Sequence, residues 1–565
     1  MELIKNAFGK DFWKRVREEK VYEGFRKELF DFLSLYENAE IPNLTYSDFK
    51  LFFVTGNRTV YQKKYFLKRK MLSHFALLSL IYPEENKYTD RLNDVIYAIC
   101  DEYTWCLPAH QPSLEENNNT HLDLFACESG YALAEISTLL ADKLDTLIKN
   151  RIDAEIERRI VTAYTNGTFY WWEKTTNNWA AVCAGSIGCT LMLARPELFR
   201  KLQGKIDGTI ECYLSGFKND GVCEEGVNYW HYGFGFFSVY ADMLYRFTDG
   251  KNNYFERQKV KKVAQFLQNM YLSEDAKVSF SDSNRAGNYH IGTLSFLKGL
   301  YPDDIKLPST KYVYYQDNCH RWALHLRSVT WLDPKHLEEN ESVGEYEHYY
   351  EDTEWLIRKN AEYGFAAKGG NNNEPHNHND VGSFIIAKGG KQALVDLGAG
   401  VYTRQYFRDE TRYGILQCSS RGHSLPIING EYQKYGKNYK AKSVRYEDGV
   451  FSLDIADAYG IDELKSLVRT FTFGEKKIML TDRYEAEEKC EIAERFVSIR
   501  EPRKATDGRV EIDGVTLVYD PSVCEVSFAN EPSFSNDAMD KDGLVYFTDF
   551  KLKDGVKEFR IEFVM

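Results

Sequence analysis

The segment Asn371-Asn372-Asn373-Glu374-Pro375-His376-Asn377-His378-Asn379-Asp380 stands where the chain changes its pattern. Its asparagines and its proline predict a loop. The loop leads into an apolar run at 383–388, which predicts a strand, and Gly389-Gly390 turns the chain into a second predicted strand at 391–396. The segment therefore marks the start of a β-rich region that carries a histidine loop at its edge.

After this segment apolar and polar residues alternate, as expected for strands with one buried face. An alternating run on each side of Gly474 predicts a hairpin. Asp513-Gly514 and Asp554-Gly555 predict further hairpin turns, and residues 559–564 predict a final strand. The pattern indicates an all-β domain over residues 341–565.

Before the segment the pattern is helical. Residues 131–144, 179–194, 234–247 and 258–272 carry apolar side chains at three- and four-residue spacing. Several of these helices are apolar on more than one face, which is typical of helices buried in a layered bundle or toroid. We therefore expect a multidomain α + β protein, with a helical domain over residues 1–340 packed against the β domain.

The composition excludes several classes of protein. Among 565 residues, 85 Asp and Glu exceed 72 Lys and Arg, and a net charge of −13 argues against a nucleic-acid binder. No apolar run is long enough for a membrane span. The 11 cysteines include no CxxC pair, and the N-terminus shows no signal-peptide pattern. We expect a cytoplasmic enzyme, with a processed secreted form as the alternative.

A hairpin turn at Gly389-Gly390 has a consequence for the histidine loop. If the turn has two residues, Lys388 pairs with Lys391, and the register places Ser383 opposite Asp396. Asp396 then lies at the end of the hairpin from which the histidine loop emerges.

A third candidate beside the loop and Asp396 is His423, in the segment Arg421-Gly422-His423-Ser424. His378, Asp396 and His423 would form a two-histidine, one-carboxylate zinc site, with a fourth position for water or another protein group. We expect one structural zinc per chain. The alternative is that these are ordinary polar residues of a loop.

The helical half carries a second group of candidates. Residues 169–172 read Phe-Tyr-Trp-Trp, residues 177–179 read Asn-Asn-Trp, and residues 224–233 hold two tyrosines and a histidine. Aromatic rings stack on sugar faces, and asparagine amides can bind a carboxylate, although aromatic residues also fill cores.

Together these motifs resemble those of the heparinase II/III-like polysaccharide lyases. The most specific match is His-Asn-His-Asn-Asp-Val-Gly-Ser-Phe at 376–384. Further matches lie at 105–110, 122–128, 177–179, 225–233, 395–403 and 421–430, and those at 412–415 and 433–436 look most like the oligoalginate and exo-acting heparin lyase branch. The resemblance covers about residues 100 to 480.

This resemblance implies an incomplete (α/α) toroid followed by an antiparallel β-sandwich, and a reaction that eliminates rather than hydrolyses. A lyase neutralises the carboxylate of a uronic acid, removes the C5 proton and protonates the departing O4. The implied substrate is an anionic, uronate-containing oligosaccharide of the glycosaminoglycan or alginate type. A homo-oligomer remains open.

Catalytic roles follow from the same resemblance. Asn178 would neutralise the carboxylate, Tyr232 would shuttle the proton with Tyr229 as the alternative, and His376 would be the partner base or a second carboxylate ligand. The family's zinc ligands match the three residues named above. The remaining matches are assigned to substrate binding, namely Asn177, Trp179, Tyr229, His110, Tyr413 and Arg421. Some family members have a histidine where this chain has Trp179, which puts a histidine base from the toroid in doubt.

Arginines near the histidine loop would supply a local positive field for an anionic sugar. They are Arg404, Arg408, Arg412 and Arg421, and surface ion pairs are the alternative for at least two of them.

Two other functions remain open. A glycoside hydrolase on an (α/α) toroid needs two carboxylic acids, for which Asp123, Glu128, Glu224 and Glu225 are available. The other alternative is a non-catalytic carbohydrate-binding relative.

Overall fold

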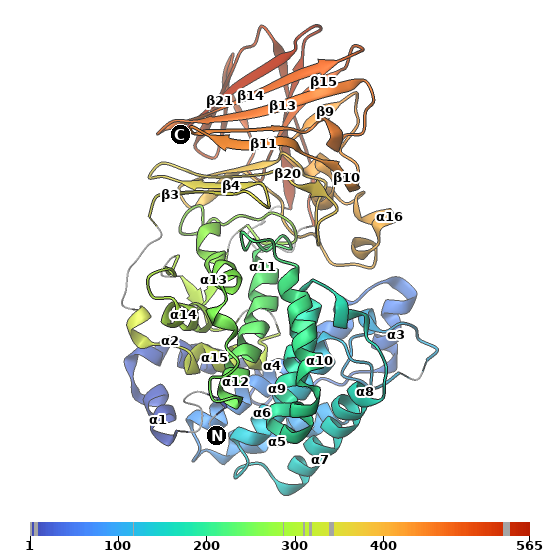
Figure 1. Cartoon of the computed structure of the whole chain (residues 1–565), viewed down its shortest axis with the longest axis vertical. Helices are drawn as coiled ribbons and strands as arrows, with labels where there is room; N and C mark the ends of the chain where they lie inside the picture. The colour runs from blue at the N-terminus through green and yellow to red at the C-terminus, as the bar shows by residue number, and fades with distance from the viewer. Residues whose placement is uncertain are drawn as a thin grey trace.

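The structure is a computed structural model that describes residues 3–4, 9–116, 118–285, 287–308, 311–315, 319–337, 344–534 and 543–565. Helices form the first part of the chain and strands the second, and the two parts lie end to end (Figure 1). The predicted fold class, a helical toroid followed by an antiparallel β-sandwich, is confirmed. The predicted boundary between residues 340 and 341 lies outside the described residues. So do residues 1–2 and 5–8, part of the N-terminal segment behind the cytoplasmic expectation.

The helical part is built from α-helices joined by short turns and by longer loops, such as the one between Gln265 and Ile291. They are α1 (Lys10–Glu18), α2 (Glu23–Tyr36), α3 (Tyr46–Thr55), α4 (Thr59–Ile81), α5 (Asn86–Cys100), α6 (Leu124–Leu139), α7 (Thr146–Ile156), α8 (Thr162–Thr165), α9 (Asn178–Ala194), α10 (Pro196–Ser215), α11 (Val227–Tyr229), α12 (Gly235–Phe247), α13 (Gln258–Gln265), α14 (Ile291–Leu300) and α15 (Trp322–Thr330). Helix α6 begins before its predicted start, because the Asp123 side chain accepts a hydrogen bond from the Ala126 backbone and caps it. The helix predicted at 258–272 divides into α13 and a 3-10 turn at Leu267–Met270.

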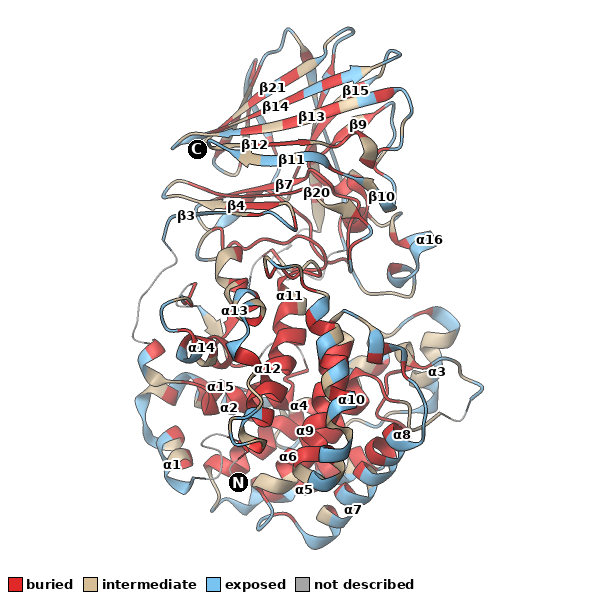
Figure 2. Cartoon of the chain, viewed as in Figure 1, coloured by how far each residue is buried: buried red, intermediate tan, exposed pale blue. Residues whose placement is uncertain are grey.

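Helix α9 is one of the most buried helices of the toroid, and its ribbon is mostly red in Figure 2. It packs against α6, α10 and α12, and nearly all its residues are buried. Small residues permit this packing: a Cβ on Gly188 would lie 2.5 Å from the Tyr240 ring. The helix is apolar on every face because neighbours cover every face.

In the residues that the structure describes, the strands form three large sheets and two small ones. Strands β3 (Tyr346–Tyr350), β4 (Trp355–Lys359), β5 (Gly364–Lys368), β7 (Phe384–Lys388) and β8 (Lys391–Leu394) form a five-stranded sheet. An eight-stranded sheet has the order β11 (Lys442–Glu447), β12 (Val450–Asp454), β13 (Leu464–Phe473), β14 (Lys477–Ala486), β21 (Glu558–Val564), β18 (Val515–Tyr519), β17 (Arg509–Ile512), β16 (Arg503–Thr506). A four-stranded sheet has the order β19 (Cys524–Pro532), β20 (Leu544–Leu552), β15 (Ile492–Ser498), β9 (Pro426–Ile428). The small sheets pair β6 (Asn371–Asn372) with β10 (Gly436–Lys440), and β1 (Tyr289–His290) with β2 (Tyr312–Val313). Helix α16 (Asp409–Arg412) is a short turn in this part.

The five-stranded sheet joins the two parts of the molecule because both of its faces are buried. Along β7, Phe384 and Ile386 enter the sandwich core, whereas Ile385 and Ala387 belong to the toroid core. This alternation follows from the two-residue period of a strand. The ring centroids of Phe384 and Phe471 are 5.0 Å apart, so the residue just after the histidine loop is anchored in the sandwich.

Two hairpin predictions need correction. Lys388 pairs with Lys391 as predicted, but a β-bulge then shifts the register so that Ile386 pairs with Leu394. The strands end before Ser383 and Asp396 could pair, and the predicted pairing of these two residues is therefore wrong. Asp396 still lies just after β8, at the end of the hairpin from which the histidine loop emerges. Asp554-Gly555 is not a hairpin turn, since β20 and β21 belong to different sheets.

The other two hairpin predictions are confirmed. The hairpin around Gly474 joins β13 to β14, with Phe473 paired to Ile478. At Asp513-Gly514 both residues have positive φ, and the turn connects the paired residues Ile512 and Val515.

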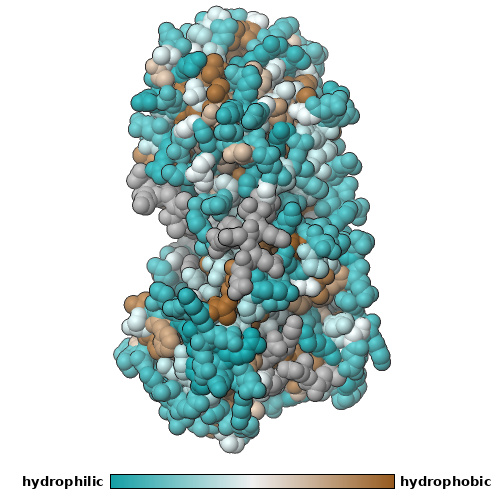
Figure 3. Space-filling model, turned by 90° about the vertical axis from the view of Figure 1, so that its left-hand side faces the viewer, coloured by the Kyte–Doolittle hydropathy of each residue, from teal (hydrophilic) through white to brown (hydrophobic). Residues whose placement is uncertain are grey.

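The molecular surface is mostly hydrophilic on the face shown in Figure 3, with brown apolar residues in small scattered patches. In the described part of the chain, no helix is both long enough and apolar enough to cross a membrane.

Candidate active site

A cavity of about 1580 Å³ opens where the toroid meets the β-sandwich. Helical and β-sandwich segments both contribute to its lining. The lining includes His110, Asn178, Trp179, Tyr229, His231, Tyr232, Asp282, Arg321, His376, Tyr402, Arg404 and Arg408. Most of the predicted site residues therefore lie around one space.

Asn178 reaches this cavity from the start of α9. The Asn177 side chain caps the helix by accepting a hydrogen bond from the Trp179 backbone at 3.1 Å, which makes Asn178 the first helical residue. Asn178 is buried, and its side-chain oxygen makes no hydrogen bond. Its backbone N–H donates to Glu225 Oε1 at 3.3 Å. The amide of Asn178 is thus available to a ligand in the cavity.

The two candidate tyrosines lie on one short helical segment. Tyr229 ends α11, and Tyr232 belongs to the π-helical turn at Trp230–Phe234 that follows. The segment begins at Gly226, which has φ of 100°, and a Cβ there would lie 2.2 Å from Ser283 Oγ. Only glycine fits this close approach, which brings the tyrosines next to the loop that carries Asp282.

Tyr229 contacts the histidine loop across the junction. Its ring stacks on the His376 ring with centroids 4.1 Å apart, and its hydroxyl lies 3.0 Å from the Tyr402 hydroxyl. Burial raises the pKa of Tyr229 above its ordinary value. The phenol therefore stays protonated at neutral pH.

Tyr232 instead belongs to an ion-pair network inside the toroid. Its hydroxyl donates to Glu128 and accepts from Arg321 Nη1 at 3.1 Å, while Arg321 pairs with Glu128. The guanidinium carbon of Arg321 also lies 4.0 Å from the centre of the Tyr232 ring. Burial raises the pKa of Tyr232 well above its ordinary value, against the opposing effect of Arg321.

His376 is held on both sides by carboxyl groups. Its Nδ1 lies 2.7 Å from Asp282 Oδ2, and because an ionised carboxylate only accepts, Nδ1 carries the proton. Its Nε2 lies 3.6 Å from Glu225 Oε2. Burial raises the pKa of Glu225 to about 7, with His376 opposing this shift. The free lone pair of neutral His376 is therefore on Nε2.

Asp282 connects this histidine to the metal-ligand candidates. Its carboxylate also accepts from His378 Nε2 at 3.2 Å, from Arg412 Nη2 at 3.2 Å and from the Tyr406 hydroxyl. Burial acts to raise the pKa of Asp282, but Arg412 and the histidines hold it well below its usual range. Sequence reasoning missed Asp282, since it lies in a loop of the toroid about a hundred residues before the histidines.

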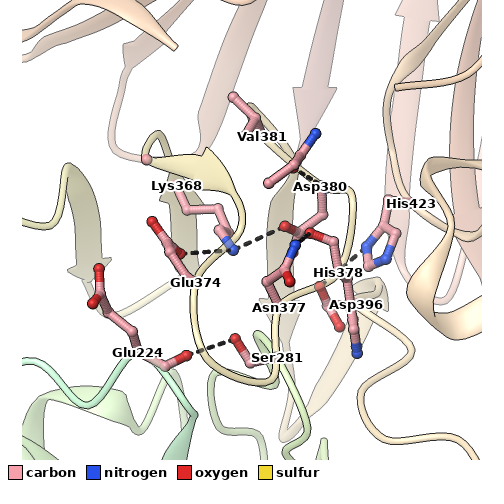
Figure 4. Close-up of polar contacts among 12 residues, drawn as sticks. Glu224, Ser281, Lys368, Glu374, Asn377, His378, Asp380, Val381, Asp396 and His423 are labelled. Atoms are coloured by element: carbon pink, nitrogen blue, oxygen red, sulfur yellow. Dashed lines mark hydrogen bonds and ion pairs between the residues drawn. The ribbon is translucent and has the colours of Figure 1, made fainter. Parts of the chain in front are cut away.

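The predicted metal ligands meet in one buried cluster. His378, Asp396 and His423 lie together with Asp380, and one ligand atom from each falls within 4.8 Å of the others. Figure 4 shows the four side chains gathered beside the β-sheet. Asp380 thus lies beside the three predicted ligands, where the sequence left a fourth position to water or another protein group.

Each ligand offers one buried atom that makes no hydrogen bond: His378 Nδ1, His423 Nδ1, Asp380 Oδ2 and Asp396 Oδ2. The opposite atom of each group is hydrogen-bonded. His378 Nε2 contacts Asp282, and His423 Nε2 donates to the Gln417 carbonyl at 2.9 Å. Asp396 Oδ1 accepts from the Gly398 backbone and Asp380 Oδ1 from Lys368 Nζ, both at 2.8 Å. Outer partners of this kind orient metal ligands, so the cluster fits a metal ion.

The remaining predicted residues divide between the cavity and other places. His110 and Trp179 line the cavity, with ring centroids 4.9 Å apart. Tyr413 lies outside its lining and donates to Asn377 at 2.9 Å, and Arg421 lies outside it in an ion pair with Glu531. The structure therefore does not bring Tyr413 and Arg421 to the other substrate-binding candidates.

The four predicted arginines also separate. Arg404 and Arg408 line the cavity, whereas Arg412 is buried against Asp282 behind it. Arg58, which sequence reasoning missed, joins the lining from α4's N-terminal end.

No family model matches the chain, and no curated protein matches its sequence. Solved structures do match over nearly the whole length. They include heparinase III (12% identity, TM-score 0.63, 100% of this chain and 93% of that one). The chain has the fold of polysaccharide lyases. Two further matches share this lyase fold. One is a heparan sulfate lyase variant from Pedobacter heparinus, with 13% identity and a TM-score of 0.62 over 99% of this chain and 86% of that one. The other is the chondroitin AC lyase of Streptomyces coelicolor A3 with chondroitin sulphate, with 8% identity and a TM-score of 0.58 over 98% of this chain and 82% of that one.

Three of the four carboxyl groups considered for a hydrolase are already engaged, whereas Glu225 Oε2 makes no hydrogen bond. Asp123 Oδ1 caps α6, and its Oδ2 lies 2.7 Å from His110 Nδ1. Glu128 pairs with Arg321, and Glu224 pairs with Lys218 at 2.6 Å. These contacts disfavour a pair of carboxyl groups that flank a sugar bond.

Proposed function

We propose that the protein is a lyase that cleaves uronate-containing oligosaccharides by β-elimination and leaves a 4,5-unsaturated uronate on the product. The observation that carries this proposal is the meeting of Asn178 and Tyr229 from the toroid with His376 from the β-sandwich around one cavity. These groups supply the three functions that elimination needs: a carboxylate partner, a base and an acid.

Asn178 is proposed to bind the uronate carboxylate. Asn178 lines the cavity, and the NH2 group of its side-chain amide can donate to the carboxylate, whereas its unpaired oxygen can only accept. A hydrogen bond to the carboxylate would stabilise the charge that develops when the C5 proton leaves.

His376 is proposed to remove the C5 proton. Asp282 holds the proton on Nδ1, so Nε2 is the acceptor, and neutral imidazole is a suitable base near pH 7. Asp282 would then stabilise the imidazolium that forms, as a carboxylate does for a catalytic histidine in other enzymes.

Tyr229 is proposed to protonate O4 of the leaving sugar. It stacks on His376, and its raised pKa keeps the proton available for donation. This reverses the order of preference that the sequence gave to the two tyrosines, because Tyr232 already donates its proton to Glu128. Tyr232 would then form part of the substrate-facing wall.

A positive lining supports an anionic substrate. Arg58, Arg404, Arg408, Lys277 and Lys391 all contribute to the cavity of a protein whose net charge is −13. Heparan sulfate and chondroitin sulphate, named for the structural neighbours, are sugars of this anionic class.

The buried cluster is proposed to hold one structural zinc through His378, Asp380, Asp396 and His423. Two nitrogen and two oxygen ligands suit a four-coordinate zinc ion. When bound, the ion would link the histidine loop to the strand end at Asp396 and the segment at His423. These residues thereby hold His376, two positions from His378, against Tyr229.

The test is an unsaturation assay on alginate, hyaluronan, chondroitin and heparin oligosaccharides. Ultraviolet absorbance from the new double bond should rise with at least one of them. Release of reducing ends without that absorbance would favour the hydrolase, and binding without either signal would favour a non-catalytic relative.

A further inference from the structure

A second group of buried histidines lies in the toroid, among residues that the cavity does not use. His74 on α4, His325 on α15 and His320 just before α15 surround Glu28 on α2. The four residues come from three helices and one loop, and Glu28 and His325 are 297 positions apart in the sequence.

The ring nitrogens converge on the Glu28 carboxylate. His74 Nε2 lies 3.1 Å from Oε1, His325 Nε2 lies 3.1 Å from Oε2, and His320 Nδ1 lies 3.4 Å from Oε1. The candidate ligand atoms of the three histidines lie within 4.8 Å of one another. The side chains of His74 and His325 are fully buried, and those of His320 and Glu28 are 10% and 18% exposed, so most of this group is shielded from bulk water.

The contacts of His74 place two acceptor atoms opposite each other, with no cation between them. Its Nδ1 lies 2.8 Å from the Lys70 carbonyl oxygen, which can only accept, so Nδ1 carries the proton. In a neutral ring Nε2 is then an acceptor, and it faces an acceptor oxygen of Glu28. Full burial disfavours the charged ring that would otherwise resolve this conflict.

His320 gives a second, independent sign of a ligand. Its Nδ1 is buried and makes no hydrogen bond, although it is directed at the cluster. The residue has φ of 46°, a conformation that non-glycine residues rarely adopt. The chain thus holds this ring in place at a backbone cost, without a hydrogen bond to compensate for it.

We propose that His74, His320, His325 and Glu28 bind a second divalent metal ion of the zinc class. Three imidazole nitrogens and one carboxylate oxygen form a suitable four-coordinate set for zinc, whereas calcium and magnesium prefer all-oxygen sites. The ion replaces the missing cation between His74 and Glu28 and uses the free nitrogen of His320.

The position of the cluster assigns the ion a structural role. It would connect α2, near the N-terminus, with α4 and with α15, the last of these helices before the β-sandwich. This link would close the two ends of the toroid on each other, and it does not depend on the proposed lyase activity.

The experiment measures zinc stoichiometry in the full-length protein after dialysis against a weak chelator and reloading with zinc alone. We expect two zinc ions per chain in the wild type. His325→Gln and His423→Ala should each retain one, and the double variant should retain none. His336→Gln is the matched control, because His336 is a buried toroid histidine that contacts Ser295 Oγ at 2.9 Å outside the cluster.

A wild-type protein that binds one zinc, and loses it in His423→Ala, would overturn the proposal. One zinc that is lost only in His325→Gln would support this site and refute the β-sandwich site. If His325→Gln does not fold, His423→Ala decides alone, since one retained zinc supports the toroid site and none overturns it.

Discussion

The surroundings of Tyr229 and Tyr232 differ sharply, although the two residues are three positions apart on one helical segment. Tyr229 faces the β-sandwich and stacks on His376, whereas Tyr232 faces the toroid and is engaged by Glu128 and Arg321. The helical turn therefore separates two chemically similar residues into different networks. Chemical role depends here on which part of the molecule each ring meets, and the following variants test that difference.

Tyr229→Phe should have the largest effect. Loss of the acid removes about 10²- to 10⁴-fold in turnover, and substrate affinity should change little because the proton moves only in the transition state. Steady-state kinetics on one active uronate oligosaccharide measure this.

Tyr232→Phe is the matched comparison and should lose less than about tenfold, the range of a removed hydrogen bond. A larger loss of turnover in Tyr232→Phe than in Tyr229→Phe would indicate that Tyr232 is the proton donor. Near-normal turnover in both variants would refute a tyrosine acid in this cavity.

Asp282→Asn should come next, with turnover about 10- to 100-fold lower, as is usual for a residue that orients a catalytic or metal-binding histidine. The amide cannot replace the carboxylate that accepts from both His376 and His378. The loss should appear in kcat rather than KM, with weaker zinc retention. Asp242→Asn controls for a lost buried carboxylate, since Asp242 pairs with Arg246 elsewhere in the toroid. Equal losses in both variants would indicate a general folding defect.

His423→Ala should release the β-sandwich zinc and lower the thermal midpoint by several degrees, because the ligand set would no longer join the histidine loop to the sheet. Activity should also fall, since His376 belongs to the histidine loop and would no longer be held in place. His348→Ala, at an exposed position on β3, is the control. Unchanged zinc content and midpoint in His423→Ala would contradict the structural role.

Glu225→Gln should have the smallest effect, on the pH dependence of stability. An unfolded glutamate ionises near pH 4.3, whereas Glu225 in the folded protein holds its proton up to about 7. Between these values the folded state binds the extra proton. Wild-type stability therefore falls by up to about 1.4 kcal/mol per pH unit. Relative to Glu225→Gln, the wild type should lose stability from pH 5 to 7 in denaturant titrations. Parallel curves would show that burial does not perturb this carboxyl group.

Much of the fold could be predicted because it depends on local patterns. The apolar residues on every face of α9 predict a buried helix, and Asp513-Gly514 predicts a hairpin turn. Both structures are present as expected. Predictions failed where a single residue changed the geometry, as at the bulge in β8, or where a turn signal joined two different sheets, as at Asp554-Gly555.

The candidate site could be predicted only in part. The sequence pointed to His378 and Asp396 because the strand turn placed Asp396 near the histidine loop, and it added His423 as a third candidate that matches the family's zinc ligands. The sequence did not identify Asp282 or Glu225 as partners of His376, since no local pattern relates these residues. It assigned Arg421 to substrate binding, but Arg421 lies outside the lining of the cavity.

The sequence alone determined the order of helical and β regions and the types of residue available for chemistry, because periodicity and turn residues act over short distances. Only the tertiary structure decided which groups meet. Packing of both faces of the five-stranded sheet places His376 against Tyr229, and the toroid loop brings Asp282 between two histidines. Such contacts join residues far apart in the chain, and their geometry depends on the packing of the whole core.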